Sequence, residues 1–211
     1  PYRCLSVSVR PVIMGADKHQ ELGVGVSAIW SPMCDRFGID SPIFGFAHDV
    51  ETVAAITNAG GFGVYGATRR FPEEIKRELA QIRSLVGNRP FGVDLVLPPG
   101  MPEHNSREAI QAEIPQEHTE FVQQLVERFE VPKASKPGMR TRFIRSKEIE
   151  QAQLRAVMES DVDMLACGIG APAEVVAQAK DRGKTTLALI GSPHHVPKAV
   201  AAGVEIIVAQ G

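Results

Sequence analysis

A carboxylate inside an apolar stretch is the first residue of this sequence whose type could do chemistry. Asp94 lies within Phe91-Gly-Val-Asp-Leu-Val-Leu-Pro98, and the apolar character of this run predicts a buried strand. A buried carboxylate must be paired or must face a polar site, because removing its charge from water is costly. Asp94 is therefore either a structural hydrogen-bonding group or the mark of a pocket.

Small residues cluster where other predicted strands end, and such positions can admit a ligand. Cys167-Gly-Ile-Gly170 follows one apolar run, and Gly191-Ser192 closes another. Four more glycines flank the earlier strands: Gly45, Gly61, Gly63 and Gly66. A ligand or a second backbone can approach closely at these positions, although tight turns alone would also explain the glycines.

Two histidines follow predicted strands and are candidates for proton transfer. His195 stands in the first turn of the helix expected after Gly191-Ser192, and His48 follows the first strand in a similar place. An imidazole can accept or donate a proton near neutral pH. A capping or packing role is the alternative for each, and the neighbouring His194 is expected to be exposed.

The first strand–helix–strand unit indicates how such residues would be positioned. Two short apolar runs, 43–47 and 62–65, predict strands, and residues 50–57 between them are apolar at helical spacing. Asp49 can cap this helix, and Gly60-Gly61 can end it. A connection of this length favours two parallel strands joined by a right-handed crossover.

The same alternation continues along the chain and predicts six strands in all. The later strands are expected at 91–98, 162–170, 185–192 and 205–210. The later helices are expected at 71–87, 116–130, 146–159, 172–182 and 194–202. Residues 99 to about 145 depart from this rhythm: a loop is expected from Pro98 to the helix at Gln116, and a mobile excursion after Val131.

This repetition favours a (β/α)8 barrel or an open doubly wound sheet. A helix, a glycine and a strand follow one another at Gly60, Gly87, Gly183 and Gly203. Neither Gly-x-Gly-x-x-Gly after the first strand nor a P-loop occurs, so the nucleotide-binding motifs of the open sheet are missing. Because small residues stand at the carboxyl ends of strands, where ligands bind to barrels, we prefer the barrel.

Composition limits the classes of partner. The chain has 211 residues, 44% hydrophobic and 23% charged, with a net charge of −2 that gives no reason to propose nucleic acid or an anionic membrane. We expect no membrane-spanning segment, because every apolar run is shorter than about 20 residues. Cys4, Cys34 and Cys167 lie far apart and match no metal or disulfide spacing. We therefore expect no metal site and a cytoplasmic location.

The two ends predict a division of the chain and an incomplete barrel. Residues 1–30 show no sustained periodicity and are expected to be a flexible leader, with a partial barrel over 31–211. The sequence begins at Pro1 and stops at Gly211, directly after an apolar run. Since a buried parallel strand needs helices over both faces, we interpret the chain as a fragment of a longer protein.

Five blocks of the sequence resemble one known family. They are Ser41-Pro-Ile-Phe-Gly-Phe-Ala-His48, Thr57-Asn-Ala-Gly-Gly-Phe-Gly-Val64, Arg89-Pro-Phe-Gly-Val-Asp-Leu95, Leu187-Ala-Leu-Ile-Gly-Ser192 and Ala202-Gly-Val-Glu-Ile-Ile-Val-Ala-Gln-Gly211. In this order they resemble the nitronate monooxygenases, formerly called 2-nitropropane dioxygenases, over about the amino-terminal two thirds of such an enzyme. The resemblance implies a (β/α)8 barrel with FMN across the carboxyl ends of its strands, here incomplete at strands one to six.

The resemblance also implies a set of flavin-contacting residues. The backbone around Gly45 and Phe46 would lie against the flavin ring, and Asp94 stands where the family commonly has asparagine. The remaining contacts from strands four to six would come from Cys167, Gly168, Gly191, Ser192, Gln210 and Gly211. His195 matches a recurrent family histidine and is the candidate catalytic residue of this chain. An ionised Asp94 would oppose reduction of the flavin unless it is protonated or paired.

The family pattern departs from this sequence at its end. The family continues after Gln-Gly with Glu-Ala-Gly-Gly-His, whose glycines hold the FMN phosphate and whose histidine is the usual base; neither follows Gly211 here. The expected activity is oxidation of an alkyl nitronate with dioxygen to a carbonyl compound and nitrite, with oligomers possible and the fragment alone inactive. The alternatives are a related flavin barrel, such as an NAD(P)H-using enoyl-acyl-carrier-protein reductase, or a truncated product without catalysis.

Overall fold

Six parallel strands form one sheet in the computed structural model of the chain, which describes residues 29–103, 106–136, 138 and 142–210. The strands are β1 (Phe44–Ala47), β2 (Phe62–Gly66), β3 (Phe91–Leu95), β4 (Met164–Cys167), β5 (Thr185–Ile190) and β6 (Ile206–Ala209). Each strand pairs with the next one along the chain, in the order β1-β2-β3-β4-β5-β6. This unbroken order is that of a barrel wall, since a doubly wound sheet reverses its strand order.

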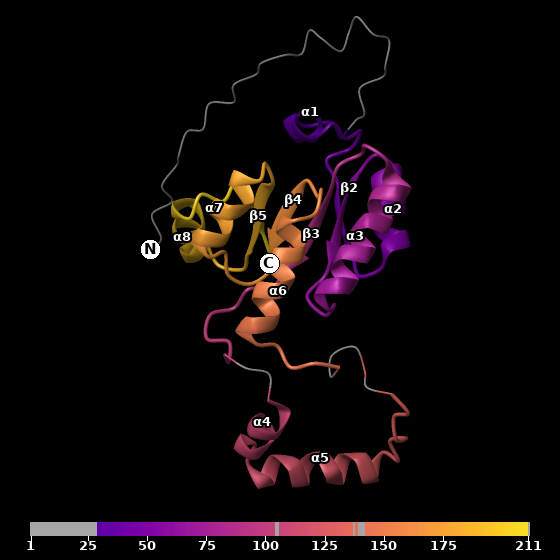
Figure 1. Cartoon of the computed structure of the whole chain (residues 1–211), viewed down its shortest axis with the longest axis vertical. Coiled ribbons are helices and arrows are strands. Elements are labelled where there is room, and N and C mark those ends of the chain that lie inside the picture. Colours follow the sequence, from indigo (N-terminus) through magenta and orange to yellow (C-terminus); the bar gives the residue numbers. More distant parts are fainter. Residues whose placement is uncertain (1–28, 104–105, 137, 139–141, 211) are drawn as a thin grey trace, which may run out of the picture.

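Most of the helices cover one face of this sheet (Figure 1). The helices are α1 (Pro32–Phe37), α2 (Val50–Asn58), α3 (Pro72–Val86), α4 (Arg107–Glu113), α5 (Gln116–Arg128), α6 (Lys147–Met158), α7 (Ala173–Asp181) and α8 (Val196–Ala201), with a short 3-10 turn at Pro193–His195. The structure confirms the alternation of strands and helices expected from the sequence, with element ends that differ by a few residues. The fold is a half-barrel of the α/β class.

The first unit forms because its local signals agree. Asp49 caps α2, with its Oδ1 accepting a hydrogen bond from the Thr52 amide at 2.8 Å. Two glycines of the strands, Gly45 and Gly63, face this helix. A Cβ at Gly45 would lie 2.7 Å from Cδ1 of Ile56, and a Cβ at Gly63 would lie 2.5 Å from the Val53 carbonyl oxygen. Both glycines therefore let α2 pack closely on β1 and β2.

The two faces of the sheet bury different clusters. The face under the helices, called here the outer face, packs Tyr65, Phe91, Val93, Leu95 and Leu165 against α2, α3, α6 and α7. The opposite, inner face carries Phe44, Phe62, Val64, Met164, Ala166 and Leu187. Because side chains alternate along a strand, each strand contributes to both clusters. This alternation decides which predicted site residues face the inside of the half-barrel.

Helix α1 covers the amino-terminal end of the inner face. Phe37 meets the rings of Phe44 and Phe62 edge-on, at centroid distances of 5.7 and 5.1 Å. Arg36 forms a 2.7 Å ion pair with Glu205, directly before β6. Helix α1 thus covers the amino-terminal end of the inner face.

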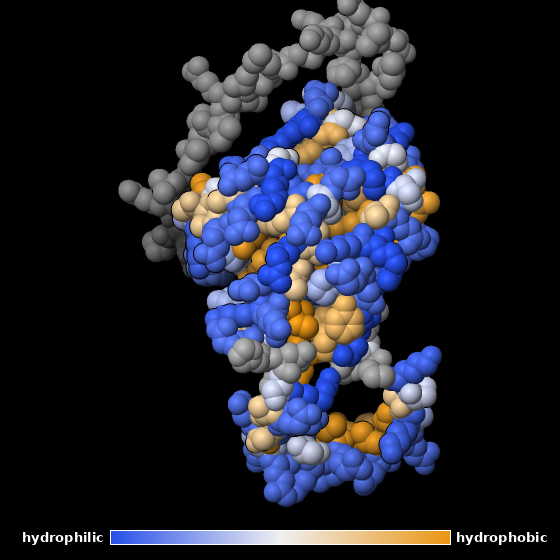
Figure 2. Space-filling view, viewed as in Figure 1, coloured by the Kyte–Doolittle hydropathy of each residue, from blue (hydrophilic) through white to orange (hydrophobic). Residues whose placement is uncertain are grey.

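The segment between β3 and α6 stands apart from the body of the molecule in Figure 1 and contains α4 and α5. The sequence predicted α5 but a loop where α4 forms; Ser106 caps α4 by accepting from the Ala109 amide at 3.2 Å. No residue of α5 is buried, and Phe121 and Phe129 are 59% and 65% exposed. Figure 2 shows the apolar side chains along this helix.

Two further expectations concern the first 30 residues and membrane-spanning segments. Of the expected leader, only residues 29 and 30 belong to the described part of the chain. Among the described helices, none is both long enough and apolar enough to cross a membrane.

Candidate functional site

Asp94 lies on the inner face of β3. Its strand neighbours Val93 and Leu95 belong to the core under the helices, so the intervening side chain points the other way. Asp94 is paired in register with Gly66 on β2 and with Ala166 on β4. Only 6% of its surface is exposed. The structure therefore places a buried carboxyl group near the carboxyl-terminal end of the half-barrel, on the side that α1 leaves open.

The glycine that follows β4 makes room for this carboxyl group. A Cβ at Gly168 would lie 3.2 Å from Oδ1 of Asp94 and 3.0 Å from a methyl group of Val96. No described residue donates a hydrogen bond to the Asp94 carboxyl. Burial raises the pKa of Asp94 from the ordinary 3.8 to about 6, and the positive charge of His48 acts in the opposite direction. Asp94 is thus a buried acid on the inner face, and its pKa lies closer to neutral pH than that of an ordinary carboxyl group.

His48 lies beside Asp94, over the end of β2. Its Nδ1 is 3.1 Å from the carbonyl oxygen of Gly66, and its ring meets the ring of Phe46 edge-on at 4.8 Å. A Cβ at Gly66 would lie 2.5 Å from this Nδ1 and 2.6 Å from Cζ of Phe46. Gly66 is therefore the residue that allows both rings to lie over the strand end. We call Phe46, His48, Gly66, Asp94 and Gly168 the mouth.

Phe46 forms the open side of the mouth. It follows Phe44 by two positions on β1 and therefore lies on the same inner face. In contrast to Phe44, which packs against Phe62 with ring centroids 5.0 Å apart, Phe46 is 55% exposed. An exposed aromatic ring beside a buried carboxyl group offers an apolar surface and a polar group to the same ligand.

A buried network on the outer face holds His48 in place, and sequence reasoning did not identify it. Arg70 donates from Nη2 to the carbonyl oxygen of His48 at 2.9 Å. Its Nε donates to the Tyr65 hydroxyl and to Glu78, at 2.8 Å each, and the Tyr65 hydroxyl donates to Glu78. Burial, followed by the bond to Glu78, raises the pKa of Tyr65, so this phenol keeps its proton.

Gln153 extends this network to α6. Although it is 1% exposed, its amide donates to the carbonyl oxygens of Thr68 and Arg70, at 3.1 and 2.7 Å. The turn after β2 is therefore fixed from the helix layer. The available signal in the sequence was the pair Arg69-Arg70, which begins three residues after the end of a predicted strand at Gly66.

Cys167 reaches the mouth only through its backbone. Its side chain belongs to the core under the helices, on the outer face. Burial, and next the negative charge of Asp94, raise the pKa of Cys167 to about 12. The thiol therefore stays protonated, and of the two predicted contacts from β4, Gly168 alone is exposed to the mouth.

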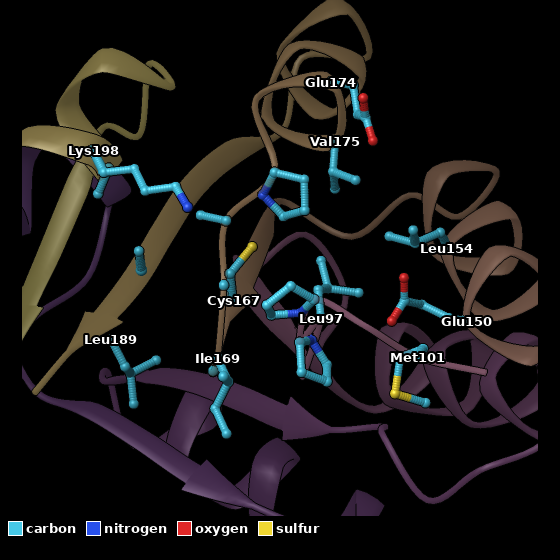
Figure 3. Close-up of a pocket in the computed structure, with 18 of the residues that line it drawn as sticks. Leu97, Met101, Glu150, Leu154, Cys167, Ile169, Glu174, Val175, Leu189 and Lys198 are labelled. Atoms are coloured by element: carbon cyan, nitrogen blue, oxygen red, sulfur yellow. The ribbon is translucent and has the colours of Figure 1, made fainter. Parts of the chain in front are cut away.

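The other predicted residues from β4 to β6 line a separate groove, which runs between α6 and α7 to the carboxyl ends of the strands (Figure 3). Its wall is formed by Leu97, Leu154 and Val175, with Lys198 extending into it from α8. The predicted residues that line it are Cys167, Gly168, Gly191, Ser192, His195 and Gln210. Gly168 thus belongs both to this groove and to the mouth, whereas Phe46 and Asp94 belong to the mouth alone.

His195 is exposed at the start of α8. Its amide donates to the Ser192 carbonyl at 3.0 Å, and its ring packs on that of His194 at a centroid distance of 3.9 Å. The Ser192 hydroxyl lies 2.8 Å from Nδ1 of His194. The structure shows these three residues as the turn that begins the helix, and a catalytic role of His195 stays a prediction.

The remaining predicted contacts fall outside the mouth. Gly45 turns its α-carbon toward α2, so only its backbone amide and carbonyl are available to a ligand. Gly211 lies outside the described residues. Within the described part of the chain, no group of three or more histidine, cysteine or acidic side chains could hold a metal ion.

Two proteins or families of similar sequence carry related names. A sequence model of the family described as Nitronate monooxygenase matches residues 30–211. Over 191 residues the chain is 34% identical to the Mycobacterium tuberculosis (strain ATCC 25618 / H37Rv) protein named "Putative monooxygenase Rv1533". That match covers 85% of this chain and 50% of the relative.

Solved structures share the fold. The nitroalkane oxidase of Streptomyces ansochromogenes matches with a TM-score of 0.62 at 23% identity, over 86% of this chain and 48% of its own. FabK from Thermotoga maritima matches with a TM-score of 0.59 at 17% identity, over 87% of this chain and 44% of its own. At these identities the likeness shows the fold alone. The chain spans about half the length of these relatives.

Proposed function

The chain belongs to the nitronate monooxygenase family, and from this we propose that it takes part in FMN-dependent oxidation of alkyl nitronates. In this reaction an alkyl nitronate and dioxygen are converted into a carbonyl compound and nitrite. The observation that carries the proposal is the mouth, where a buried Asp94 lies between Gly66 and Gly168 at the carboxyl-terminal ends of parallel strands. Ligands of barrel enzymes bind at this end.

The residues of the mouth fit a flat, mostly apolar ring with a polar edge. Gly168 places no side chain over the strand end, and Phe46 presents an exposed aromatic surface on β1. Asp94 can accept a hydrogen bond when ionised and donate one when protonated. FMN, when bound, supplies the two-electron chemistry, and the chain supplies the binding surface and its electrostatics.

Three features of the chain would serve the reaction directly. Helix α1 covers the amino-terminal end of the inner face. Phe46 limits access from the side of β1. Asp94 sets the charge of the mouth, which matters because a nitronate is an anion and is repelled by an uncompensated carboxylate.

Three further assignments belong to this proposal. His195, Gly191, Ser192 and Gln210 would approach the substrate or cofactor from the groove end of the half-barrel. The natural partners would be a small nitronate and dioxygen, with association into oligomers possible. A cytoplasmic location is proposed because Cys34 and Cys167 are both free thiols in the described structure.

The experiment that tests the function separates it from the flavin-dependent enoyl reductase alternative. The complete gene product is purified, and its visible absorbance is recorded to detect bound flavin. It is then mixed without oxygen with propyl-1-nitronate or with NADPH. We expect bound FMN that is bleached by the nitronate, followed by nitrite formation when oxygen is admitted. Bleaching by NADPH alone would support the reductase, and a protein that takes up no FMN would indicate a product without catalysis.

A further inference from the structure

We propose that helix α5 pairs with the α5 helix of a second copy of this chain, antiparallel and face to face, to form a symmetric homodimer. The contact surface would be the apolar side of the helix, called here the α5 face, which consists of Phe121, Val122, Leu125, Val126 and Phe129. The proposal goes beyond the proposed function, because it depends on neither flavin nor substrate.

The α5 face is continuous and exposed, as Figure 2 shows. Its residues recur at spacings of three and four positions, so they lie along one side of the helix. No residue of α5 is buried in the described part of the chain. The exposed fractions are 59% for Phe121, 57% for Val122, 36% for Val126 and 65% for Phe129. An apolar stripe of this kind on an otherwise polar helix indicates that another surface packs on it.

The opposite side of α5 is polar and is bonded within the helix. Nε2 of Gln116 donates to Oε1 of Glu120 at 2.7 Å, and Nε2 of Gln123 donates to Oε1 of Glu127 at 2.8 Å. These side chains can remain in water whatever the helix contacts. The two sides of α5 therefore differ, and a partner must pack on the α5 face.

The two ends of the inserted segment are fixed side by side on the body, so that α5 is held as an arm. The Lys147 amide donates to the Pro102 carbonyl oxygen at 2.9 Å, and the Lys147 side chain pairs with Glu103. Arg145, just before α6, donates to the Val96 carbonyl oxygen at the end of β3. Figure 1 shows α5 apart from the sheet and its helices. The arm thus presents the α5 face to another molecule.

The size of the α5 face suits a dimer. With about 200 Å² for a fully exposed phenylalanine and about 150 Å² for a valine, the exposed fractions of Phe121, Val122, Val126 and Phe129 correspond to roughly 400 Å² per copy. Two faces packed together would remove up to about 800 Å² of apolar surface from water. Because apolar atoms supply about 56–65% of an interface, the whole contact would measure about 1,200–1,400 Å², which is the size of a specific interface.

The charges beside the α5 face are self-complementary in an antiparallel pair. Glu117 stands in the first turn of α5 and Arg128 in the last, about three turns later, so both lie on the same flank of the face. A two-fold axis brings this flank against its own copy, with the first turn opposite the last turn. Glu117 of each copy therefore meets Arg128 of the other, whereas in parallel helices the two charges would lie at opposite ends of the pair. Such complementarity favours a second copy as the partner.

Sedimentation equilibrium of the complete gene product, over a range of concentrations, tests the pairing. We expect a reversible dimer whose dissociation constant rises at least about tenfold in the double variant Phe121→Ser/Phe129→Ser. The matched control is Gln123→Ser/Gln124→Ser, which changes the same helix on its polar side and should leave the constant unchanged. Since the α5 face lies outside the buried core, copies of the double variant should stay folded, which far-ultraviolet circular dichroism checks.

Charge reversal tests the antiparallel arrangement. Glu117→Arg and Arg128→Glu each place like charges opposite each other at both ends of the pair, so each should raise the dissociation constant about three- to tenfold at low salt. The two changes combined restore opposite charges and should return the constant close to the wild-type value. Glu117 and Arg128 of one helix lie about 16 Å apart along its axis, so this restoration can come only from contact between copies.

The outcomes separate the possible partners of α5. A gene product that stays monomeric at every concentration would overturn the proposal, and protection of the α5 amides from hydrogen exchange in that monomer would assign the α5 face to another part of the same chain. A dimer that Phe121→Ser/Phe129→Ser leaves intact would place the interface elsewhere. A dimer that this variant weakens, but that the combined charge reversal does not restore, would overturn the antiparallel arrangement. Failure to bind FMN would count only against the proposed function.

Discussion

The guanidinium of Arg70 donates a 2.9 Å hydrogen bond to the carbonyl oxygen of His48, joining the outer face of the sheet to the turn that carries the imidazole. The same side chain is held by Glu78, 2.8 Å from its Nε. The backbone of His48 is thus fixed from the helix layer, while its ring lies over Gly66 on the inner face. Arg70 is a positioning residue for the mouth.

Loss of this link should destabilise the protein. Arg70→Met leaves Glu78 and Tyr65 without their shared cation, and both partners are mostly buried, so the free energy of unfolding should fall by about 1–3 kcal/mol. Urea unfolding measures the change. The matched control is Arg77→Met, since Arg77 also approaches Glu78, at 3.6 Å, but is 65% exposed. It should change stability by less than about 0.5 kcal/mol; equal losses in the two variants would contradict the assignment.

Asp94 should make the stability depend on pH in a known direction. Its pKa is raised by burial to about 6, so between its unfolded and folded pKa values the native state binds more protons. Stability contributed by this group is therefore lost as pH rises from about 4 to about 6. At pH about 7.5 the free energy of unfolding of Asp94→Asn, measured with urea, should exceed that of the wild type by about 1–3 kcal/mol. At pH about 4.5 the two free energies should be nearly equal. A difference that is the same at both pH values would refute burial as the cause.

Truncating an apolar side chain should cost more stability in the body of the molecule than in the inserted helix α5. Leu79 of α3 is 1% exposed, so Leu79→Ala should cost about 2–5 kcal/mol of stability. Phe121 of α5 is 59% exposed, so Phe121→Ala should cost less than about 1 kcal/mol despite its larger ring. Urea unfolding of both variants provides the comparison. A large loss for Phe121→Ala would show that α5 is buried against a surface outside the described contacts.

The 211-residue chain on its own should bind FMN weakly. In the structure β1 and β6 each pair with a single strand, and the phosphate-holding glycines implied by the family pattern are not in this sequence. Hydrogen bonds to a charged group contribute about 1.5–3 kcal/mol each, so lacking two or three of them weakens binding by roughly two to six powers of ten. Fluorescence titration with FMN tests this, with the complete gene product as control. Micromolar binding by the 211 residues would show that the phosphate is held elsewhere.

Local patterns in the sequence were sufficient to predict most of the elements. The helix expected at 71–87 forms as α3, and the four residues of its apolar stripe, Ile75, Leu79, Ile82 and Val86, are buried. Asp49 was predicted as a cap, and it accepts a hydrogen bond from the amide three residues later. Ser146 does the same at the start of α6. Such signals act over one or two turns of chain, so they can be read without knowledge of the fold. Helix α4 was missed because its seven residues carry too short a pattern.

The sequence by itself determined the half-barrel and the presence of a carboxyl group in its third strand. The tertiary structure alone decided that Asp94 and His48 are neighbours, that Cys167 faces the helices, and that Arg70 holds the turn after β1. These relations join residues up to 46 positions apart, from His48 to Asp94. They depend on the register between strands and on which face the helices cover, and both are set by packing across the whole sheet.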